Sequence, residues 1–267
     1  MATRDLDDPH SAWAIERGDA PLVATAIHDG HELRPEVQEK LALTEEERLR
    51  EEDPLTGLFT TVAPTVVRAF RSRFEVDLNR PRERAVYRTP DDAWGLELWT
   101  EPLSDALVDR SLAVYDAFYG AMRSLFDDLA ERWGRVVVYD IHSYNHRRRG
   151  RAEPPESLSR NPDVNVGTGT MDRDRWRPVV EAFEGALVGA EVRGRELDVR
   201  ENVKFLGGHF GEWLHASYPT TVCVLSIELK KTFMNEWDGE ANILAVEELR
   251  RALAATVPPV LAALKAE

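Results

Sequence analysis

Four short runs of strand-forming residues each lead into side chains that bind metals, carboxylates or protons, and this pattern constrains the fold most strongly. The runs are residues 23–27 before His28, 74–78 before Asn79 and Arg80, 136–141 before His142, and 222–227 before Glu228. In open α/β sheets, ligands bind beyond the carboxyl ends of the strands. We therefore expect these side chains to gather at one edge of one sheet.

Amphipathic helices are predicted between these runs and after the last of them. The clearest covers residues 104–134, where apolar side chains recur every three or four positions and so share one face. Ser104 can cap its start and Gly134 can end it. Further helical patterns cover residues 172–187 and 240–257, and we expect the second to end or kink at Pro258-Pro259. Helices that feed continuous apolar strands predict an α/β fold whose sheet is covered on both faces.

The remaining segments are consistent with one domain. Residues 1–20 are interpreted as an irregular N-terminal arm, residues 62–70 as a helical turn and residues 197–205 as a further strand. The charged segment 44–53 predicts a surface helix exposed to solvent, and residues 147–160 predict an exposed loop. No linker divides the chain, so residues 1–267 are assigned to a single domain.

Composition narrows the class of protein and partner. The 267 residues carry 34 Lys and Arg against 48 Asp and Glu, and the net charge of −14 disfavours nucleic acid and anionic membranes, even beside the arginine-rich segment 147–151. No apolar stretch reaches the ~18 residues of a membrane span. The first twenty residues lack the apolar centre of a signal peptide, which predicts a cytoplasmic protein. Cys223, the only cysteine, excludes an intrachain disulfide and lies in an apolar run typical of a buried thiol.

Three histidines form the candidate metal centre. His28 and His31 are separated by two residues, a short spacing that zinc sites use because a turn lets both imidazoles reach one ion. His142 follows a different strand and would be a distant third ligand, which leaves the fourth coordination position open for water. The sequence leaves open Glu32 in place of His31, His146 as a competing ligand, and Asp29 and Asp140 as partners that orient the imidazoles.

Charged residues after the other runs predict contacts with a substrate. Arg80 presents a planar fork of donors that matches a carboxylate, Asn79 can donate to the same group, and Arg73 can stabilise an oxyanion. Glu228 follows an apolar run, where a carboxylate is costly to bury unless it is paired or functional, and it can act as a general base. The structural alternatives are an arginine paired with Asp77 or Glu83, and Glu228 paired with Lys230, Lys231 or an arginine.

The ordered segments VDLNRPRERAVY, YDIHSYNHRR, NVGTGT, FLGGHF and LSIELKKTFMNEW resemble the N-formylglutamate amidohydrolase family, over residues 23–240. The resemblance implies a zinc-carboxypeptidase-like (phosphorylase/hydrolase-like) fold, a single α/β domain with a mixed central sheet flanked by helices. It also implies zinc at His28, His31 and His142, Glu228 as base, Arg73 polarising the scissile carbonyl, and Asn79, Arg80 and Tyr144 as substrate contacts. The carboxypeptidase pattern has glutamate at the second ligand, where this chain has His31.

The activity that the resemblance implies is zinc-dependent hydrolysis of the amide bond of an N-acyl amino acid, first of all N-formyl-L-glutamate to formate and L-glutamate. Two rivals remain: a deacylase or carboxypeptidase acting on other acyl amino acids or peptide ends, and a non-catalytic protein of the same fold that binds an acidic amino acid. The expected partner is a small molecule, whose second carboxylate needs a further cation among residues 147–149 or at Lys204. The sequence leaves open the oligomeric state and the roles of His209 and His215.

Overall fold

The structure is a computed structural model of the chain, and it describes residues 4–265. Within those residues the strands are β1 (Trp13–Glu16), β2 (Leu22–Ala26), β3 (Thr65–Ala69), β4 (Val136–Tyr144), β5 (Val164–Gly167), β6 (Glu191–Val192), β7 (Arg195–Glu196), β8 (Val199–Glu201) and β9 (Val222–Lys230). The helices are α1 (Pro35–Gln38), α2 (Glu45–Glu51), α3 (Thr56–Phe59), α4 (Asp105–Trp133), α5 (Arg177–Leu187), α6 (His209–Ser217) and α7 (Ile243–Lys265). Short 3-10 helices cover Pro9–Ala12, Thr60–Val62, Arg82–Arg84, Pro90–Ala93 and Leu158–Arg160.

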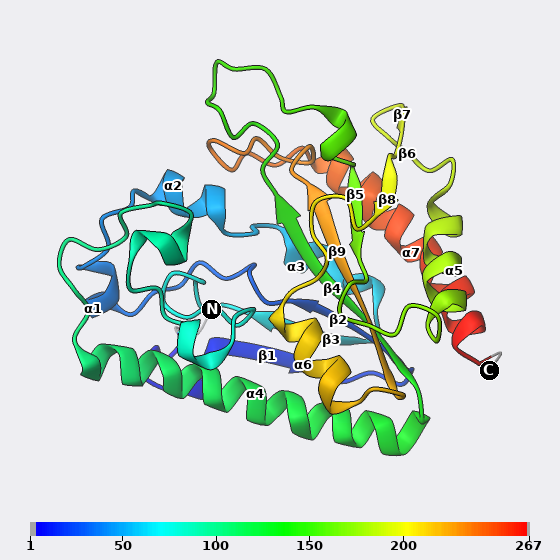
Figure 1. The fold of residues 1–267 in the computed structure, drawn as a ribbon, viewed down its shortest axis with the longest axis horizontal. Helices are drawn as coiled ribbons and strands as arrows, with labels where there is room; N and C mark the ends of the chain where they lie inside the picture. The colour runs from blue at the N-terminus through cyan, green and yellow to red at the C-terminus, as the bar shows by residue number, and fades with distance from the viewer. Residues whose placement is uncertain (1–3, 266–267) are drawn as a thin grey trace.

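The main sheet is mixed, with the strand order β1-β3-β2-β4-β9-β5-β8 (Figure 1). Strands β3, β2, β4 and β9 run parallel to one another, whereas β1 is antiparallel to β3 and β5 is antiparallel to β9. Because the parallel strands are central, their carboxyl ends meet at one edge of the sheet. The candidate site lies at this edge.

Strands β4 and β9 form the centre of the sheet and position the site. Each has nine residues, and the register pairs every residue of β4 with one of β9. Successive side chains point to opposite faces. Val137, Tyr139 and Ile141 pack in the same cluster as α5 and α7, whereas Val136 and Val138 pack with α4. By this alternation, the even-numbered residues near the end of β4 face the layer of α4 and α6.

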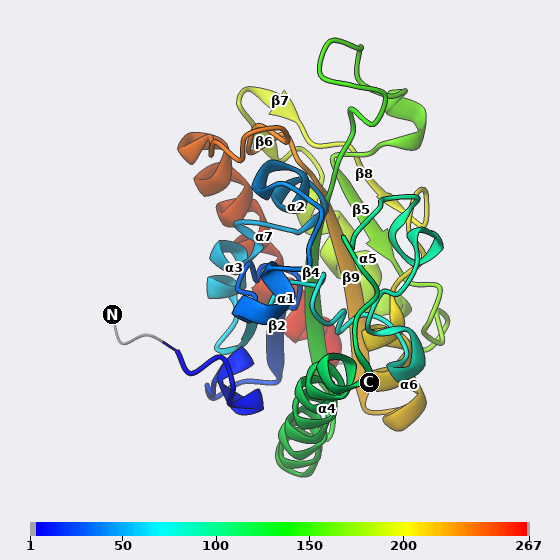
Figure 2. The same cartoon turned by 90° about the vertical axis from the view of Figure 1, so that its left-hand side faces the viewer.

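Two helical layers cover the two faces of the sheet. Helices α4 and α6 pack on one face through a cluster that contains Phe118, Met122 and Phe210, and α5 and α7 pack on the other through Phe183 and Leu253 (Figures 1 and 2). The predicted fold class, an α/β fold with a mixed central sheet flanked by helices on both faces, is confirmed.

The long helix α4 begins and ends as its sequence indicates. The Ser104 side chain accepts a hydrogen bond from the Leu107 amide, and Gly134 ends the helix with a positive φ of 71°, which glycine adopts readily. Of the two alternatives expected at Pro258-Pro259, an end of the helix is wrong, because α7 continues to Lys265, and a kink stays a prediction. Val260 and Leu264 are buried in the core beyond the proline pair, and this packing offsets the two amide donors that the prolines lack.

The predicted strand at residues 74–78 is wrong. The segment forms turns, in which the amides of Glu75 and Val76 both donate to the Ser72 carbonyl. The strand lies earlier, as β3, within the stretch 62–70 that we expected to form a helical turn. The β-branched residues at the start of β3 favour extended backbone. The alternating pattern at 74–78 has another cause, because Phe74 packs in one apolar cluster and Val76 in another.

Several other boundaries differ from the predictions. Residues 13–16 of the expected N-terminal arm form the edge strand β1, and residues 1–3 lie outside the described residues. The strand expected at 197–205 is reduced to β8, and the helix expected from residue 172 begins at residue 177. The predicted loop at 147–160 projects from the end of β4 (Figures 1 and 2). Between residues 4 and 265, no helix is long and apolar enough to cross a membrane.

Candidate active site

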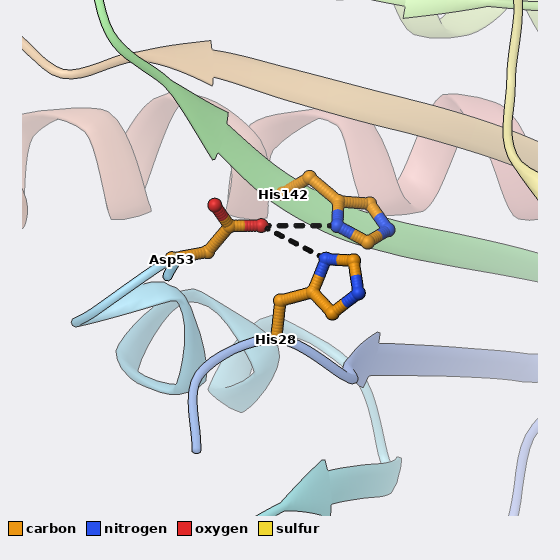
Figure 3. A group of neighbouring side chains, drawn as sticks. All are labelled: His28, Asp53 and His142. Carbon is orange, nitrogen blue, oxygen red and sulfur yellow. Dashed lines mark hydrogen bonds and ion pairs between the residues drawn. The ribbon is translucent and has the colours of Figure 1, made fainter. Parts of the chain in front are cut away.

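Three buried donors from separate elements meet at the sheet edge (Figure 3). His28 follows β2, His142 lies near the end of β4, and Asp53 follows α2. One ligand atom of each residue lies within 4.8 Å of the others. The Nδ1 atoms of His28 and His142 are 3.5 Å and 3.1 Å from Asp53 Oδ2, and the ring centroids are 4.9 Å apart. Two imidazoles and a carboxylate at this separation fit a divalent metal ion.

A second carboxylate holds the outer nitrogen of each imidazole. His28 Nε2 is 2.7 Å from Asp77 Oδ1, and His142 Nε2 is 3.1 Å from Asp140 Oδ2. Asp140 also accepts a hydrogen bond of 2.6 Å from the Thr25 hydroxyl. Metal-binding histidines usually carry such a carboxylate on the far nitrogen, because it fixes the ring and leaves the near nitrogen for the ion. The arrangement is thus the one expected for the inner and outer groups of a metal site.

Asp77 is the most extensively bonded carboxylate of the site. Its Oδ2 accepts hydrogen bonds from Arg73 Nη2 at 2.8 Å and from the Tyr87 hydroxyl, and its Oδ1 accepts one of 2.8 Å from the Asn79 amide. Burial alone would raise the pKa of Asp77, but the charge of Arg73 and the contact with His28 hold it well below its usual value. Asp77 therefore stays ionised and orients the His28 ring.

The contacts among these carboxylates and imidazoles also shift the pKa values of Asp53 and His142. Burial alone would raise the pKa of Asp53, but hydrogen bonds from His142 and His28 hold this pKa below its usual value. Burial alone would lower the pKa of His142, but Asp140 and Asp53 raise it well above 6.5. A metal ion binds neutral imidazole, so binding would release the proton that these carboxylates stabilise.

Glu228 lies beside His142 in the neighbouring strand. The register of β4 and β9 pairs these two residues, so their side chains project from the same face of the sheet. Burial raises the pKa of Glu228 to about 8; His142 opposes this shift, whereas Asp53 and Asp140 add to it. The carboxyl group is therefore protonated at neutral pH unless a nearby cation stabilises its charge. The structure thus brings Glu228 next to His142, as the strand pattern led us to expect.

His28, Asp53, His142 and Glu228 line a cavity of about 190 Å³. This volume is below the range of about 300–1,000 Å³ that accommodates drug-sized ligands, so the cavity fits a small molecule. Its cationic side chains are Arg50, Arg73, Arg148 and Lys231, and its carboxylates are Glu51, Asp53 and Glu228. The excess of cations in the wall favours an anionic ligand, although the chain as a whole is acidic.

His31 does not join the metal donors, and this corrects the prediction that it is the second ligand. Its Nδ1 contacts the Glu52 carboxylate, and its side chain is 37% exposed. Both His31 and its proposed alternative, Glu32, line a separate open cavity of about 730 Å³. The backbone at Glu32 pairs with that of Arg71, which carries the turn after β2 away from the site. Asp53 takes the place that the spacing had suggested for His31.

Sequence reasoning missed Asp53 because it is the last acid of the charged segment that we interpreted as exposed. Helix α2 ends at Glu51, and the next two residues, Glu52 and Asp53, are only 1% and 3% exposed. The Asp53 amide donates to the His28 carbonyl at 3.0 Å, so two of the donors are tied through the backbone. The available signal was Pro54, which marks the end of the helix. That signal does not distinguish a buried turn residue from an exposed one.

The predicted substrate contacts fall into two groups. Arg73 and Asn79 line the cavity, and Asn79 Nδ2 lies 3.5 Å from His142 Nε2. Tyr144 also lines the cavity, but its hydroxyl donates to the Pro162 carbonyl. Arg80 is not part of the wall, because its guanidinium donates to the Asp92 carbonyl at 2.9 Å. Of the expected pair Asn79 and Arg80, the structure therefore places only Asn79 in the cavity.

The other candidates lie mostly outside the cavity. His146 pairs with Glu236, His209 with Glu212, His215 with the Val224 amide and the Thr170 hydroxyl, Asp29 with Arg68, and Lys204 with Asn161 and Glu156. Of residues 147–149, Arg148 lines the cavity, where Glu51 binds its guanidinium with contacts of 2.8 Å and 2.9 Å. Arg148 is therefore the member of that segment that can meet a ligand.

Comparison with known proteins finds one matching family and several similar structures. The family model described as N-formylglutamate amidohydrolase matches residues 20–234. The chain is similar in structure to an N-formylglutamate amidohydrolase from Ralstonia eutropha, with a TM-score of 0.74 and 19% identity over 95% of this chain and 98% of that one. It is also similar to a gene product of Agrobacterium tumefaciens, with a TM-score of 0.62 and 19% identity over 94% and 92% of the two chains.

These structural likenesses, at 19% identity, show the fold alone. No curated protein matches the chain. The family model spans most of the sequence, including His28, Asp53, His142 and Glu228. The chain belongs to the N-formylglutamate amidohydrolase family.

Proposed function

We propose that the protein hydrolyses the amide bond of an N-acyl amino acid with zinc as cofactor, and that N-formyl-L-glutamate is its substrate. Membership of the family makes the chain an N-formylglutamate amidohydrolase-like hydrolase. The observation that carries the zinc proposal is the buried group of His28, Asp53 and His142 beside Glu228. Two imidazoles and one carboxylate are a known ligand set of catalytic zinc, which keeps a further position open.

In this proposal Glu228 is the general base and later the general acid. When bound, zinc supplies a Lewis acid that acidifies water and polarises the acyl carbonyl. Glu228 ionises when a cation lies beside His142, because its pKa of about 8 reflects burial without sufficient compensating charge. The carboxylate takes a proton from water as the water oxygen attacks the acyl carbon. It returns the proton to the amide nitrogen as the C–N bond breaks, which gives formate and the free amino acid.

Arg73 is proposed to stabilise the oxyanion that forms on the acyl oxygen. Three contacts fix its guanidinium: Nη2 donates to Asp77 at 2.8 Å, Nε to the Tyr87 hydroxyl at 3.3 Å and Nη1 to the Glu51 carbonyl at 3.3 Å. Of its five N–H donors, two remain for an oxygen in the cavity. A donor that is already held in place needs little reorganisation as negative charge develops.

The charge of the cavity supports a substrate with two carboxylates. We assign the α-carboxylate to Asn79, which lies next to His142, and the side-chain carboxylate to Arg148. The Arg148 side chain is 41% exposed and paired with Glu51. Glu51 is only 9% exposed, but Arg50 Nε also lies 3.9 Å from its carboxylate, so Glu51 keeps a cationic partner when Arg148 turns to a substrate carboxylate.

Metal analysis and a panel of N-acyl amino acids test the proposal. We expect one zinc ion per chain and the highest kcat/KM for the combination of a formyl group with glutamate, when acyl group and amino acid are varied separately. Glu228→Gln should keep the zinc and lower kcat by about 10²–10⁴-fold, the usual contribution of a general base.

Other results would select the rival functions. Full zinc occupancy without hydrolysis of any N-acyl amino acid would indicate a binding protein. Faster cleavage of peptide ends than of formyl amino acids would indicate a carboxypeptidase. A purified protein that binds no divalent metal would refute the mechanism.

A further inference from the structure

Lys231 is a buried lysine in the wall of the cavity, one residue beyond β9. It is 1% exposed, and its ammonium donates to the carbonyl oxygens of Arg50 and Glu52, both at 2.7 Å. Its backbone amide donates to the Tyr144 carbonyl at the end of β4, at 3.0 Å. Lys231 therefore connects the two central strands of the sheet to the end of α2.

The charge of Lys231 is compensated differently from that of its neighbour. Across residues 4–265, no carboxylate oxygen lies within 4.0 Å of the Lys231 ammonium, whereas Lys230, 4% exposed, pairs with Asp163 at 2.6 Å. An isolated buried charge is costly, so its polar contacts have to stabilise it. The two carbonyls lie at the C-terminal end of α2, where unpaired carbonyl groups and the helix dipole favour a cation.

The segment that Lys231 contacts is the one that presents Asp53. The Asp53 amide donates to His28, and the Asn145 side chain donates at 2.7 Å to the same Arg50 carbonyl that Lys231 contacts. His142 lies within a central strand, and its position is fixed by the sheet ladder. Asp53 lies in irregular backbone, so its position depends on contacts of this kind, which also include those of Thr56 with the Asp53 carbonyl and of Arg73 with the Glu51 carbonyl.

We propose that Lys231 is a positioning residue of the metal centre, whose ammonium fixes the end of α2 so that Asp53 meets His28 and His142. This inference rests on the proposed function, because that function assigns Asp53 to the metal. Lys231→Met removes both carbonyl contacts and keeps an unbranched side chain of similar length. Outer partners of metal ligands typically contribute about 10–100-fold to metal affinity, and we expect a loss in this range.

The test measures the zinc affinity of the metal-stripped full chain by competition with a chelator, together with amide hydrogen exchange at Glu52 and Asp53. Lys230→Met is the matched control, because it removes an equally buried ammonium one position away that contacts Asp163 instead. We expect Lys231→Met to bind zinc about 10–100-fold more weakly and to exchange both amides faster. Lys230→Met should lower stability but keep the zinc affinity and both exchange rates.

Three results with the lysine variants would overturn the inference. The first is that Lys231→Met binds zinc as tightly as the wild type. The second is that Lys231→Met and Lys230→Met lose the same amount of zinc affinity. If Lys231→Met does not fold, Lys231→Arg decides, because its guanidinium can reach both carbonyls and should keep the zinc affinity within about tenfold. The third result is therefore that Lys231→Arg folds but loses more than about tenfold in zinc affinity. A wild-type protein that binds no zinc would refute the metal centre itself, and with it this role of Lys231.

Discussion

Replacement of Asp53 by asparagine tests the assignment of the third metal donor. The substitution keeps the size of the side chain but removes the negative charge that lies 3.5 Å and 3.1 Å from the Nδ1 atoms of His28 and His142. Asp53 is 3% exposed, and loss of one partner from a buried charge pair typically costs about 3–5 kcal/mol. At about 1.4 kcal/mol per tenfold, zinc affinity should fall by about two to three and a half orders of magnitude.

His31→Ala provides the comparison that makes this test sharp. His31 is the ligand that the sequence spacing suggested, yet it contacts Glu52 and lies outside the metal group. We expect its removal to change zinc affinity by less than about tenfold, below the range for direct partners of metal ligands. Chelator competition measures both variants, and circular dichroism checks that both are folded. Loss of zinc in His31→Ala with retention in Asp53→Asn would refute the assignment.

Substitutions at four other positions test the roles of single side chains. Arg73→Ala should lower kcat by about 10²-fold or more, because it removes the donor proposed for the oxyanion. Arg80→Ala should change KM little, because Arg80 lies outside the cavity. Steady-state kinetics that show a large rise in KM for Arg80→Ala and an unchanged kcat for Arg73→Ala would return the binding of the substrate carboxylate to Arg80. In metal-free protein, folded Glu228 keeps its proton up to a pKa of about 8, whereas the unfolded chain loses it near 4.5. As the pH rises from about 4.5 to about 8, the free energy of unfolding of the wild type should therefore fall relative to that of Glu228→Gln. The expected change is a few kcal/mol, at about 1.4 kcal/mol per pKa unit. Urea titrations in which the difference between the two proteins stays constant over this pH range would contradict the prediction. Cys223→Ser should keep kcat and lose about 1–3 kcal/mol of unfolding free energy, because it buries an unpaired hydroxyl in the core; a large loss of kcat in the folded variant would show that the thiol affects catalysis.

The central strands could be predicted from sequence because their signals are local. Strands covered on both faces need apolar side chains in both directions, and the runs that became β2, β4 and β9 have them. Parallel strands end at the same edge, so topology alone brings His28, His142 and Glu228 together. The position of these three residues therefore follows from the order of the strands and needs no knowledge of loop structure.

Asp53 and Arg80 could not be placed in the same way. Their positions depend on how irregular segments pack against the sheet, and such packing leaves no period in the sequence. Asp53 is buried because it follows the end of α2 that packs against the cavity, whereas Glu45, Glu46 and Glu47 in the first turn of α2 are exposed. Arg80 is drawn from the cavity by the Asp92 carbonyl, twelve residues along the chain. A strand-like alternation at residues 74–78 arises from contacts with two different clusters, which sequence alone does not separate.

The residue-by-residue pairing of β4 with β9 limits how chain length can vary in this protein. One residue inserted upstream of His142 within β4 would turn its imidazole toward the apolar layer of α5 and α7, and an insertion within β9 would do the same to Glu228. Insertions in the loop at 147–157 leave that alternation intact. Length changes compatible with activity should therefore be confined to the connections, while either central strand accepts substitutions but no odd-numbered change in length.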